Sequence, residues 1–125
     1  METGDRGPLQ MFGDVVVVED DPTLRELLAE IVGDFGAVCR AFATCDEALT
    51  YLTNDSPCGV VISDHGVPGC LQGFDFLMIV QARWPLVRCV LTSGYDMSEY
   101  AIPKHWTYLA KPWTVTSLQA CFEGI

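Results

Sequence analysis

Short apolar runs alternate with amphipathic stretches along most of the chain. Residues 15–18 form a continuous β-branched run, residues 59–63 repeat this buried-strand pattern, and residues 87–91 are predicted to form another strand. Short runs that are apolar at nearly every position are typical of parallel strands covered on both faces. Two further strands are predicted at residues 37–42 and 106–110. The pattern therefore predicts five strands, most of them buried.

Helical patterns fill the segments between these strands. Asp21 and Pro22 form an N-cap and a first-turn proline, and apolar residues then recur at helical spacing until Gly36. Thr44 and Glu47 have the spacing of a capping box at the start of a second helix. Three further helices are predicted from apolar spacing, at residues 74–82, 98–102 and 115–122.

Strict alternation of buried strands with helices predicts an α/β fold with a doubly wound parallel sheet, because right-handed crossovers place helices on both faces. Residues 14–125 are long enough for one such domain. Residues 1–13 have no hydrophobic period and are predicted to form a flexible leader. No apolar run approaches the roughly 18 residues that span a membrane. We therefore expect a soluble, cytoplasmic protein.

Composition narrows the function classes. The net charge is -10, from 17 acidic and 7 basic residues, which argues against direct binding to the phosphate backbone of a nucleic acid. The chain has six cysteines but no CxxC unit, and several lie in apolar segments. We expect free thiols in a reducing compartment.

Polar side chains follow four of the predicted strands directly. Glu19 and Asp20 follow the first strand, Asp64 the third, Ser93 the fourth and Lys111 the fifth. The carboxyl ends of parallel strands meet at one edge of the sheet, where ligands bind. We therefore expect three carboxylates, a hydroxyl and an ammonium group to form one site.

This set of side chains suggests phosphoryl chemistry. Close carboxylates repel one another unless a cation lies among them, so Mg²⁺, or Mn²⁺ in its place, is predicted at Glu19, Asp20 and Asp64, with the main-chain carbonyl of Gly66. With Lys111 and the metal neutralising phosphoryl oxygens, the Asp64 carboxylate can attack phosphorus. Ser93 can donate its hydroxyl, and the small residues Gly66 and Gly94 allow the main chain to approach.

Four segments, VVVVEDDP, VVISDHGVPG, VLTSGY and YLAKPW, occur in this order. Together they resemble the receiver domains of bacterial two-component response regulators, and the resemblance covers residues 14–125. It implies a flavodoxin-like sheet of order 2-1-3-4-5 and a cis Lys111-Pro112 bond. It also implies the metal pair at Glu19 and Asp20, phosphorylation of Asp64, a phosphate-binding Lys111, and switch residues at Ser93 and Tyr108.

The resemblance further implies partners. The phosphodonor would be the phosphohistidine of a sensor histidine kinase or of a histidine phosphotransfer protein. Phosphorylation would change the face formed by the fourth helix, fifth strand and fifth helix, which a homodimer could also use. Such a domain takes part stoichiometrically and hydrolyses its own phosphate slowly, so a turnover enzyme is not expected.

Two other functions remain open from the residues. One is a degenerate receiver that binds proteins without being phosphorylated. The other is a Mg²⁺-dependent phosphohydrolase, which would carry a second aspartate where this chain has Gly66. We expect no catalytic role for His65, because its side chain should point away from that of Asp64. His105 is predicted to be exposed.

Overall fold

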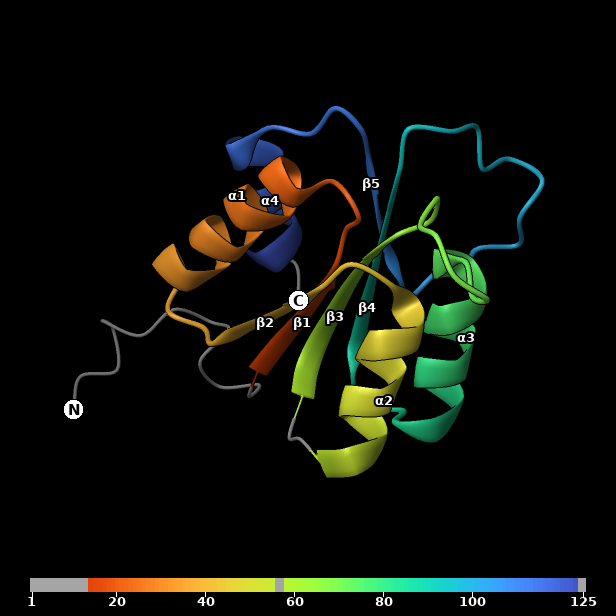
Figure 1. Cartoon of the computed structure of the whole chain (residues 1–125). Coiled ribbons are helices and arrows are strands. Elements are labelled where there is room, and N and C mark those ends of the chain that lie inside the picture. The colour runs from red at the N-terminus through yellow and green to blue at the C-terminus, as the bar shows by residue number, and fades with distance from the viewer. Residues whose placement is uncertain (1–13, 56–57, 124–125) are drawn as a thin grey trace.

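The described residues, 14–55 and 58–123, form a three-layer α/β fold in this computed structural model (Figure 1). The predicted leader at residues 1–13 lies outside this range. Five strands form the central layer: β1 (Asp14–Val18), β2 (Cys39–Phe42), β3 (Cys58–Asp64), β4 (Arg88–Ser93) and β5 (Thr107–Ala110). Four helices cover it: α1 (Pro22–Asp34), α2 (Cys45–Asp55), α3 (Gly73–Arg83) and α4 (Val115–Glu123).

The strands are all parallel and follow the order β2-β1-β3-β4-β5, which confirms the predicted sheet. Val17 pairs with Ile62, which in turn pairs with Val90 across the three central strands. Helices α1 and α4 lie on one face of the sheet, and α2 and α3 lie on the other (Figure 1). All strands therefore end at the same edge.

Each face of the sheet packs against its own helical layer because successive strand residues point to opposite sides. Val16, Val18 and Val61 belong to the core beneath α2 and α3, whereas Val15 and Val17 belong to the core beneath α1 and α4. All five are buried. This two-sided burial explains why the strands read as continuous apolar runs rather than as alternating ones.

The predicted helix boundaries have clear local causes. The Asp21 side chain accepts hydrogen bonds from the main-chain amides of Thr23 and Leu24, so it caps α1 as expected. Gly36 follows that helix with a positive φ of 94°, which favours glycine. At α2 the Glu47 amide donates to Thr44 Oγ1 at 3.1 Å, as in a capping box. None of the described helices is long and apolar enough to cross a membrane.

The prediction of a helix at residues 98–102 is wrong. The connection between β4 and β5 contains turns and irregular chain, and its main-chain hydrogen bonds are local. The Ser98 amide donates to the Asp96 side chain, and the Tyr100 amide donates to the Met97 carbonyl. Pro103 has no amide proton and disfavours a helical residue before it. The predicted helix, residues 98–102, would have had little more than one turn before Pro103, which is too short to be stable by itself.

Candidate functional site

Three carboxylates gather at the carboxyl edge of the sheet, as predicted. Glu19 and Asp20 follow β1 and Asp64 ends β3, and one oxygen from each lies within 4.8 Å of the others. Glu19 and Asp64 are buried, with 1% and 6% of their surface exposed, whereas Asp20 is exposed. The cluster therefore opens to solvent on the side of Asp20.

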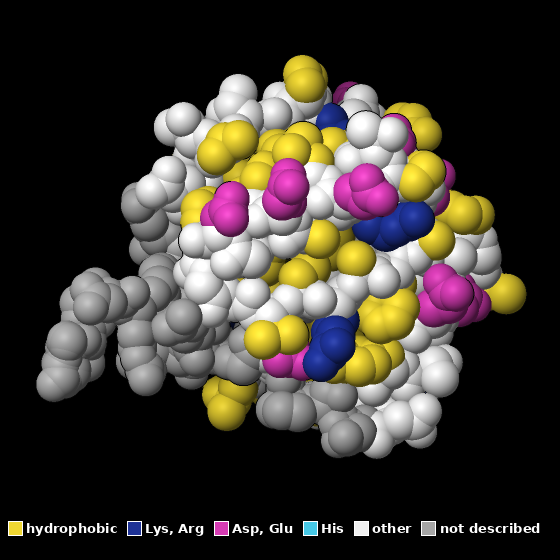
Figure 2. Space-filling view, turned by 60° about the vertical axis from the view of Figure 1, so that its left-hand side comes forward, with side chains coloured by type: hydrophobic (Ala, Val, Ile, Leu, Met, Phe, Trp, Pro, Cys, Tyr) yellow, Lys and Arg dark blue, Asp and Glu magenta, His cyan; other side chains and the backbone are white. Residues whose placement is uncertain are grey.

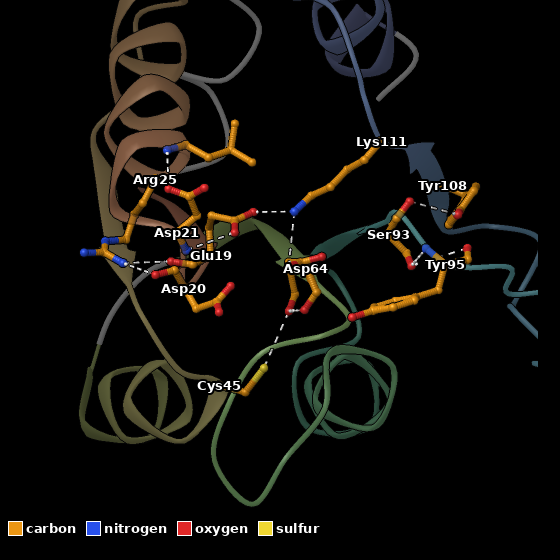
Figure 3. A network of polar contacts seen from close by, with 12 residues as sticks. Glu19, Asp20, Asp21, Arg25, Cys45, Asp64, Ser93, Tyr95, Tyr108 and Lys111 are labelled. Atoms are coloured by element: carbon orange, nitrogen blue, oxygen red, sulfur yellow. Dashed lines mark hydrogen bonds and ion pairs between the residues drawn. The ribbon is translucent and has the colours of Figure 1, made fainter.

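Lys111 closes the other side of this cluster (Figure 3). Its Nζ lies 2.9 Å from Glu19 Oε1 and 3.3 Å from Asp64 Oδ2. The residue follows β5, and its main-chain amide donates to the Ser93 carbonyl at 2.9 Å, which fixes its position beside β4. The peptide bond to Pro112 is cis, as expected. One ammonium group therefore bridges two buried carboxylates that come from two other strands.

Burial and the neighbouring charges shift the pKa values of Glu19 and Lys111. Burial raises the pKa of Glu19 above its usual value; hydrogen bonds from Lys111 and from the Asp21 amide oppose this shift without cancelling it, and the charge of Asp64 adds to it. For Lys111, burial lowers the pKa, but the hydrogen bond to Glu19 and the charges of Asp64 and Glu19 outweigh it, so the pKa is raised. The site holds more negative charge than one lysine balances.

The chemistry of the donors fits a hard divalent cation. Mg²⁺ and Mn²⁺ bind carboxylate oxygens while keeping several water molecules. Here three carboxylates each offer one oxygen, and that of Asp20 is exposed to water. A cation would also offset the burial that raises the pKa of Glu19. Glu19, Asp20 and Asp64 are therefore the residues that could hold a metal ion.

Ser93 ends β4 near the same edge and is buried. Its Oγ accepts a hydrogen bond from the Tyr95 amide at 2.8 Å and donates to the Tyr95 carbonyl at 3.5 Å. The Tyr108 hydroxyl donates to the Ser93 carbonyl at 3.4 Å, while 39% of this side chain's surface is exposed. The two expected switch residues are therefore neighbours, joined through the main chain of Ser93.

The two glycines expected to admit a ligand differ in their surroundings. A Cβ on Gly66 would lie 2.6 Å from Cε2 of Tyr95, so any larger residue would require this exposed ring to move aside. A Cβ on Gly94 would have the Lys111 Cβ at an ordinary 3.8 Å, so packing alone does not require glycine there. Tyr95 therefore covers the loop that follows Asp64.

Other residues at the site were not predicted from the sequence. Arg25, on α1, donates from Nη1 to the carbonyls of Glu19 and Asp20, at 2.9 and 3.4 Å, and so holds the main chain of both acidic residues. Beneath Asp64, the buried Cys45 Sγ lies 3.5 Å from Ser63 Oγ, which donates to the Asp64 carbonyl. An arginine in the first turn of the helix that follows the acidic pair is visible in the sequence and could have been predicted to belong to the site. The contact of Cys45 could not, because it depends on how the chain folds.

The two histidines lie away from this cluster of charges. His65 is buried and contacts Tyr100 and the start of α3, whereas the Asp64 side chain faces Lys111. His105 is exposed, as predicted, and shares a hydrogen bond with Gln81. All six cysteines are free, also as predicted.

A parallel α/β sheet of this order, with an acidic cluster and a lysine at its carboxyl edge, defines a class of signalling domain. Residues 15–123 match the family described as response regulator receiver domain. The chain belongs to this family.

Relatives and solved structures agree with this assignment. The chain is 27% identical to the DNA-binding transcriptional regulator NtrC of Proteus hauseri over 115 residues, which cover 89% of this chain and 24% of that protein. It is 32% identical to the hydrogenase transcriptional regulatory protein HoxA of Cupriavidus necator, over 79% of this chain and 21% of that protein. The chain thus spans about a quarter of the length of these curated relatives.

A similar fold occurs in the response regulator protein TrrA of Thermotoga maritima, solved in complex with Mg²⁺ and BeF. The TM-score is 0.75 at 23% identity, over 90% of this chain and 97% of that one. At this identity the likeness concerns the fold. The family match establishes this chain as a receiver domain of two-component signalling, and the structural likeness agrees with its fold.

Proposed function

We propose that this receiver domain accepts a phosphoryl group on Asp64 from a phosphohistidine. The observation that carries the proposal is the position of the Asp64 carboxylate, which is buried, lies 3.3 Å from Lys111 and shares a cluster with Glu19 and Asp20. In the transfer an Asp64 oxygen forms a bond to phosphorus while the phosphorus–nitrogen bond breaks. The electron pair of that bond stays on the imidazole nitrogen of the donor.

Each neighbouring side chain has a separate task in this transfer. When held by Glu19, Asp20, Asp64 and the Gly66 carbonyl, Mg²⁺ or Mn²⁺ would supply positive charge against the phosphoryl oxygens. Lys111 pairs with Glu19 and Asp64 before transfer, and it can turn its ammonium group to a phosphoryl oxygen afterwards. Positive charge then faces the new anion from two sides.

Ser93 and Tyr108 are the proposed switch residues. The Ser93 hydroxyl bonds to the Tyr95 main chain, so binding a phosphoryl oxygen requires it to leave these partners. The Tyr108 hydroxyl bonds to the Ser93 carbonyl and would respond to that movement. The affected surface consists of β5, α4 and residues 94–106, since the helix expected in this face is absent from the described residues. We propose this face for homodimer formation or output.

The proposed phosphodonor is a sensor histidine kinase or a histidine phosphotransfer protein. Leu24, Gly94, Lys111, Pro112 and Trp113 line a hollow of about 410 Å³ beside the site. Figure 2 shows the side of the molecule that carries α1 and α4, where hydrophobic side chains lie next to a row of acidic ones. A partner with an apolar centre and basic rim would fit this surface.

The proposed compartment of this chain is the cytoplasm, because its cysteines are free thiols, which a reducing compartment maintains.

Intact-mass spectrometry after incubation with acetyl phosphate tests the proposal. We expect one phosphoryl adduct that requires Mg²⁺ and disappears in Asp64→Asn. Asp75→Asn, which changes an aspartate on α3, is the matched control and should be phosphorylated normally. A folded protein that gains no adduct with Mg²⁺ present, or an Asp64→Asn variant that gains a normal one, would contradict the proposal. A folded but unmodified domain would favour the phosphorylation-independent binding module.

A further inference from the structure

His65, the residue after Asp64, is held by both of its ring nitrogens. Nδ1 accepts a hydrogen bond from the Phe74 amide at 3.2 Å, at the start of α3. Because Nδ1 accepts a hydrogen bond there, it carries no proton, and the ring proton is on Nε2. Nε2 lies 3.2 Å from the Tyr100 hydroxyl and donates to it. A buried side chain next to the phosphoacceptor is therefore bonded to a residue of the β4–β5 connection.

Aromatic packing strengthens this link. The Tyr100 ring lies edge-on to the His65 ring with centroids 4.9 Å apart, and its centroid is 5.0 Å from that of Phe74. Phe74 in turn lies 5.6 Å from Trp106, just before β5. A row of four rings thus joins the Asp64 loop, α3 and the connection between β4 and β5. Edge-on and tilted contacts of this kind are favourable beyond simple burial.

Tyr100 lies at the middle of the connecting segment, residues 94–106. Side-chain hydrogen bonds fasten the ends of this segment, from the Tyr95 amide to Ser93 and from Trp106 Nε1 to Gln81. Between these ends the segment has no helix to hold it, and its main-chain hydrogen bonds are local. The Tyr100 side chain bonds the middle of the segment to the rest of the fold.

We propose that Tyr100 is a positioning residue that couples the Asp64 loop to residues 94–106, so that a phosphoryl group on Asp64 alters how this segment is held. The inference rests on the proposed phosphorylation of Asp64. The His65 main chain bonds to Thr92 and Gly73, which ties the Asp64 loop to β4 and to the start of α3. A phosphoryl group that rearranges residues 64–66 would then displace the His65 ring relative to Tyr100. The coupling is separate from the contact between Tyr108 and Ser93, because it runs through His65 and Tyr100 and uses neither of those two residues.

If Tyr100 couples the two segments, a phosphate analogue bound at Asp64 and a substitution of Tyr100 should have non-additive effects on amide hydrogen exchange in residues 94–106. The probe is beryllofluoride with Mg²⁺, added to the full chain, and the readout is amide hydrogen exchange across residues 94–106. Tyr100→Phe removes the hydroxyl and keeps the ring. Without beryllofluoride we expect this variant to exchange about fivefold faster than the parent in this segment, which is the effect of losing one hydrogen bond.

With beryllofluoride we expect this fivefold difference to fall towards one, because the rearranged loop no longer holds the Tyr100 hydroxyl. A purely structural role would leave the ratio unchanged. The same ratio in both states, or a ratio of one in both, would overturn the inference. His65→Phe in the Tyr100→Phe background should add nothing to exchange in this segment, since the bond between the two side chains is already lost. The second bond that His65→Phe removes, from the Phe74 amide, lies at the start of α3 and outside the segment.

Tyr51→Phe is the matched control. The Tyr51 hydroxyl also donates a hydrogen bond, to Asp14 Oδ2 at 3.0 Å, at the start of β1. This variant should leave exchange across residues 94–106 as in the parent in both states. If beryllofluoride changes no exchange near Asp64 in the parent, the proposed function fails and the inference with it. If it protects residues 64–66 but the ratio stays constant, the inference alone fails.

Discussion

At the scale of residues, the site is a set of charges that do not balance. Two buried carboxylates face one ammonium group, and burial raises the pKa of Glu19 despite its hydrogen bond from Lys111. A charge removed from water needs a partner, so any change in the cationic side of this site should alter both stability and metal affinity. Lys111 is the residue on which both effects can be measured.

Lys111→Ala should lower the free energy of unfolding at neutral pH by about 2 kcal/mol without metal, because Glu19 and Asp64 lose their cationic partner. Added Mg²⁺ should then stabilise the variant more than the parent, since no ammonium group competes for the carboxylates. Urea unfolding with and without Mg²⁺ measures both effects. Lys104→Ala, at an exposed position, serves as the control. An equal Mg²⁺ effect in parent and Lys111→Ala would contradict this interpretation.

At the scale of elements, the position of α3 depends on one glycine. A Cβ on Gly73, the first residue of α3, would lie 2.4 Å from the Asp64 carbonyl oxygen and 2.7 Å from the His65 Cα, which are main-chain atoms that cannot move aside easily. This helix therefore starts directly against the loop that follows Asp64. In α1, by contrast, a Cβ on Gly33 would meet nothing within 4 Å.

These two glycines give opposite predictions for the same substitution. Gly73→Ala should lower the free energy of unfolding by about 2 kcal/mol or more, because overpacking against main chain forces α3 or the loop to shift. Gly33→Ala should raise it by about 0.5 to 1 kcal/mol, since alanine is the better helix former. Denaturant unfolding of both variants measures the difference. A Gly73→Ala variant as stable as the parent would show that α3 does not pack so closely.

The elements also show which features the sequence could predict. Strands buried on both faces leave a continuous apolar signal, and in a parallel sheet that signal places Glu19, Asp20, Asp64, Ser93 and Lys111 at one edge. The connection between β4 and β5 lacked such a signal, because its course depends on non-local packing of Met97 and Trp106. Residues that act through one contact across the fold, such as Tyr95 and Tyr100, were missed for the same reason.

At the scale of the whole molecule, the core contains several titratable thiols. Burial raises the pKa of Cys45, Cys58 and Cys121 from the ordinary 9.0 to about 11, and that of Cys89 to about 12. These thiols stay protonated in the folded state at pH values where the unfolded chain has released its protons. Since the unfolded state then binds fewer protons, stability must fall as pH rises from 9 towards 11.

We therefore expect the urea midpoint, measured under reducing conditions, to fall steeply between pH 9 and pH 11. Lys111 adds to the loss at the upper end, because its raised pKa holds a proton that the unfolded chain releases earlier. Cys89→Ala should flatten the pH dependence, whereas Cys70→Ser, at an exposed position, should leave it unchanged. A midpoint independent of pH in this range would contradict the burial of these thiols.

The central claim, that Asp64 is the residue that accepts the phosphoryl group, can be tested most directly by chemical mapping. Borohydride reduces an aspartyl phosphate to homoserine, so the protein is treated with acetyl phosphate and Mg²⁺, reduced, digested and sequenced by mass spectrometry. We predict homoserine at position 64, only when both Mg²⁺ and acetyl phosphate are present. Homoserine at another aspartate, or none in a protein that has gained a phosphoryl group, would contradict the account.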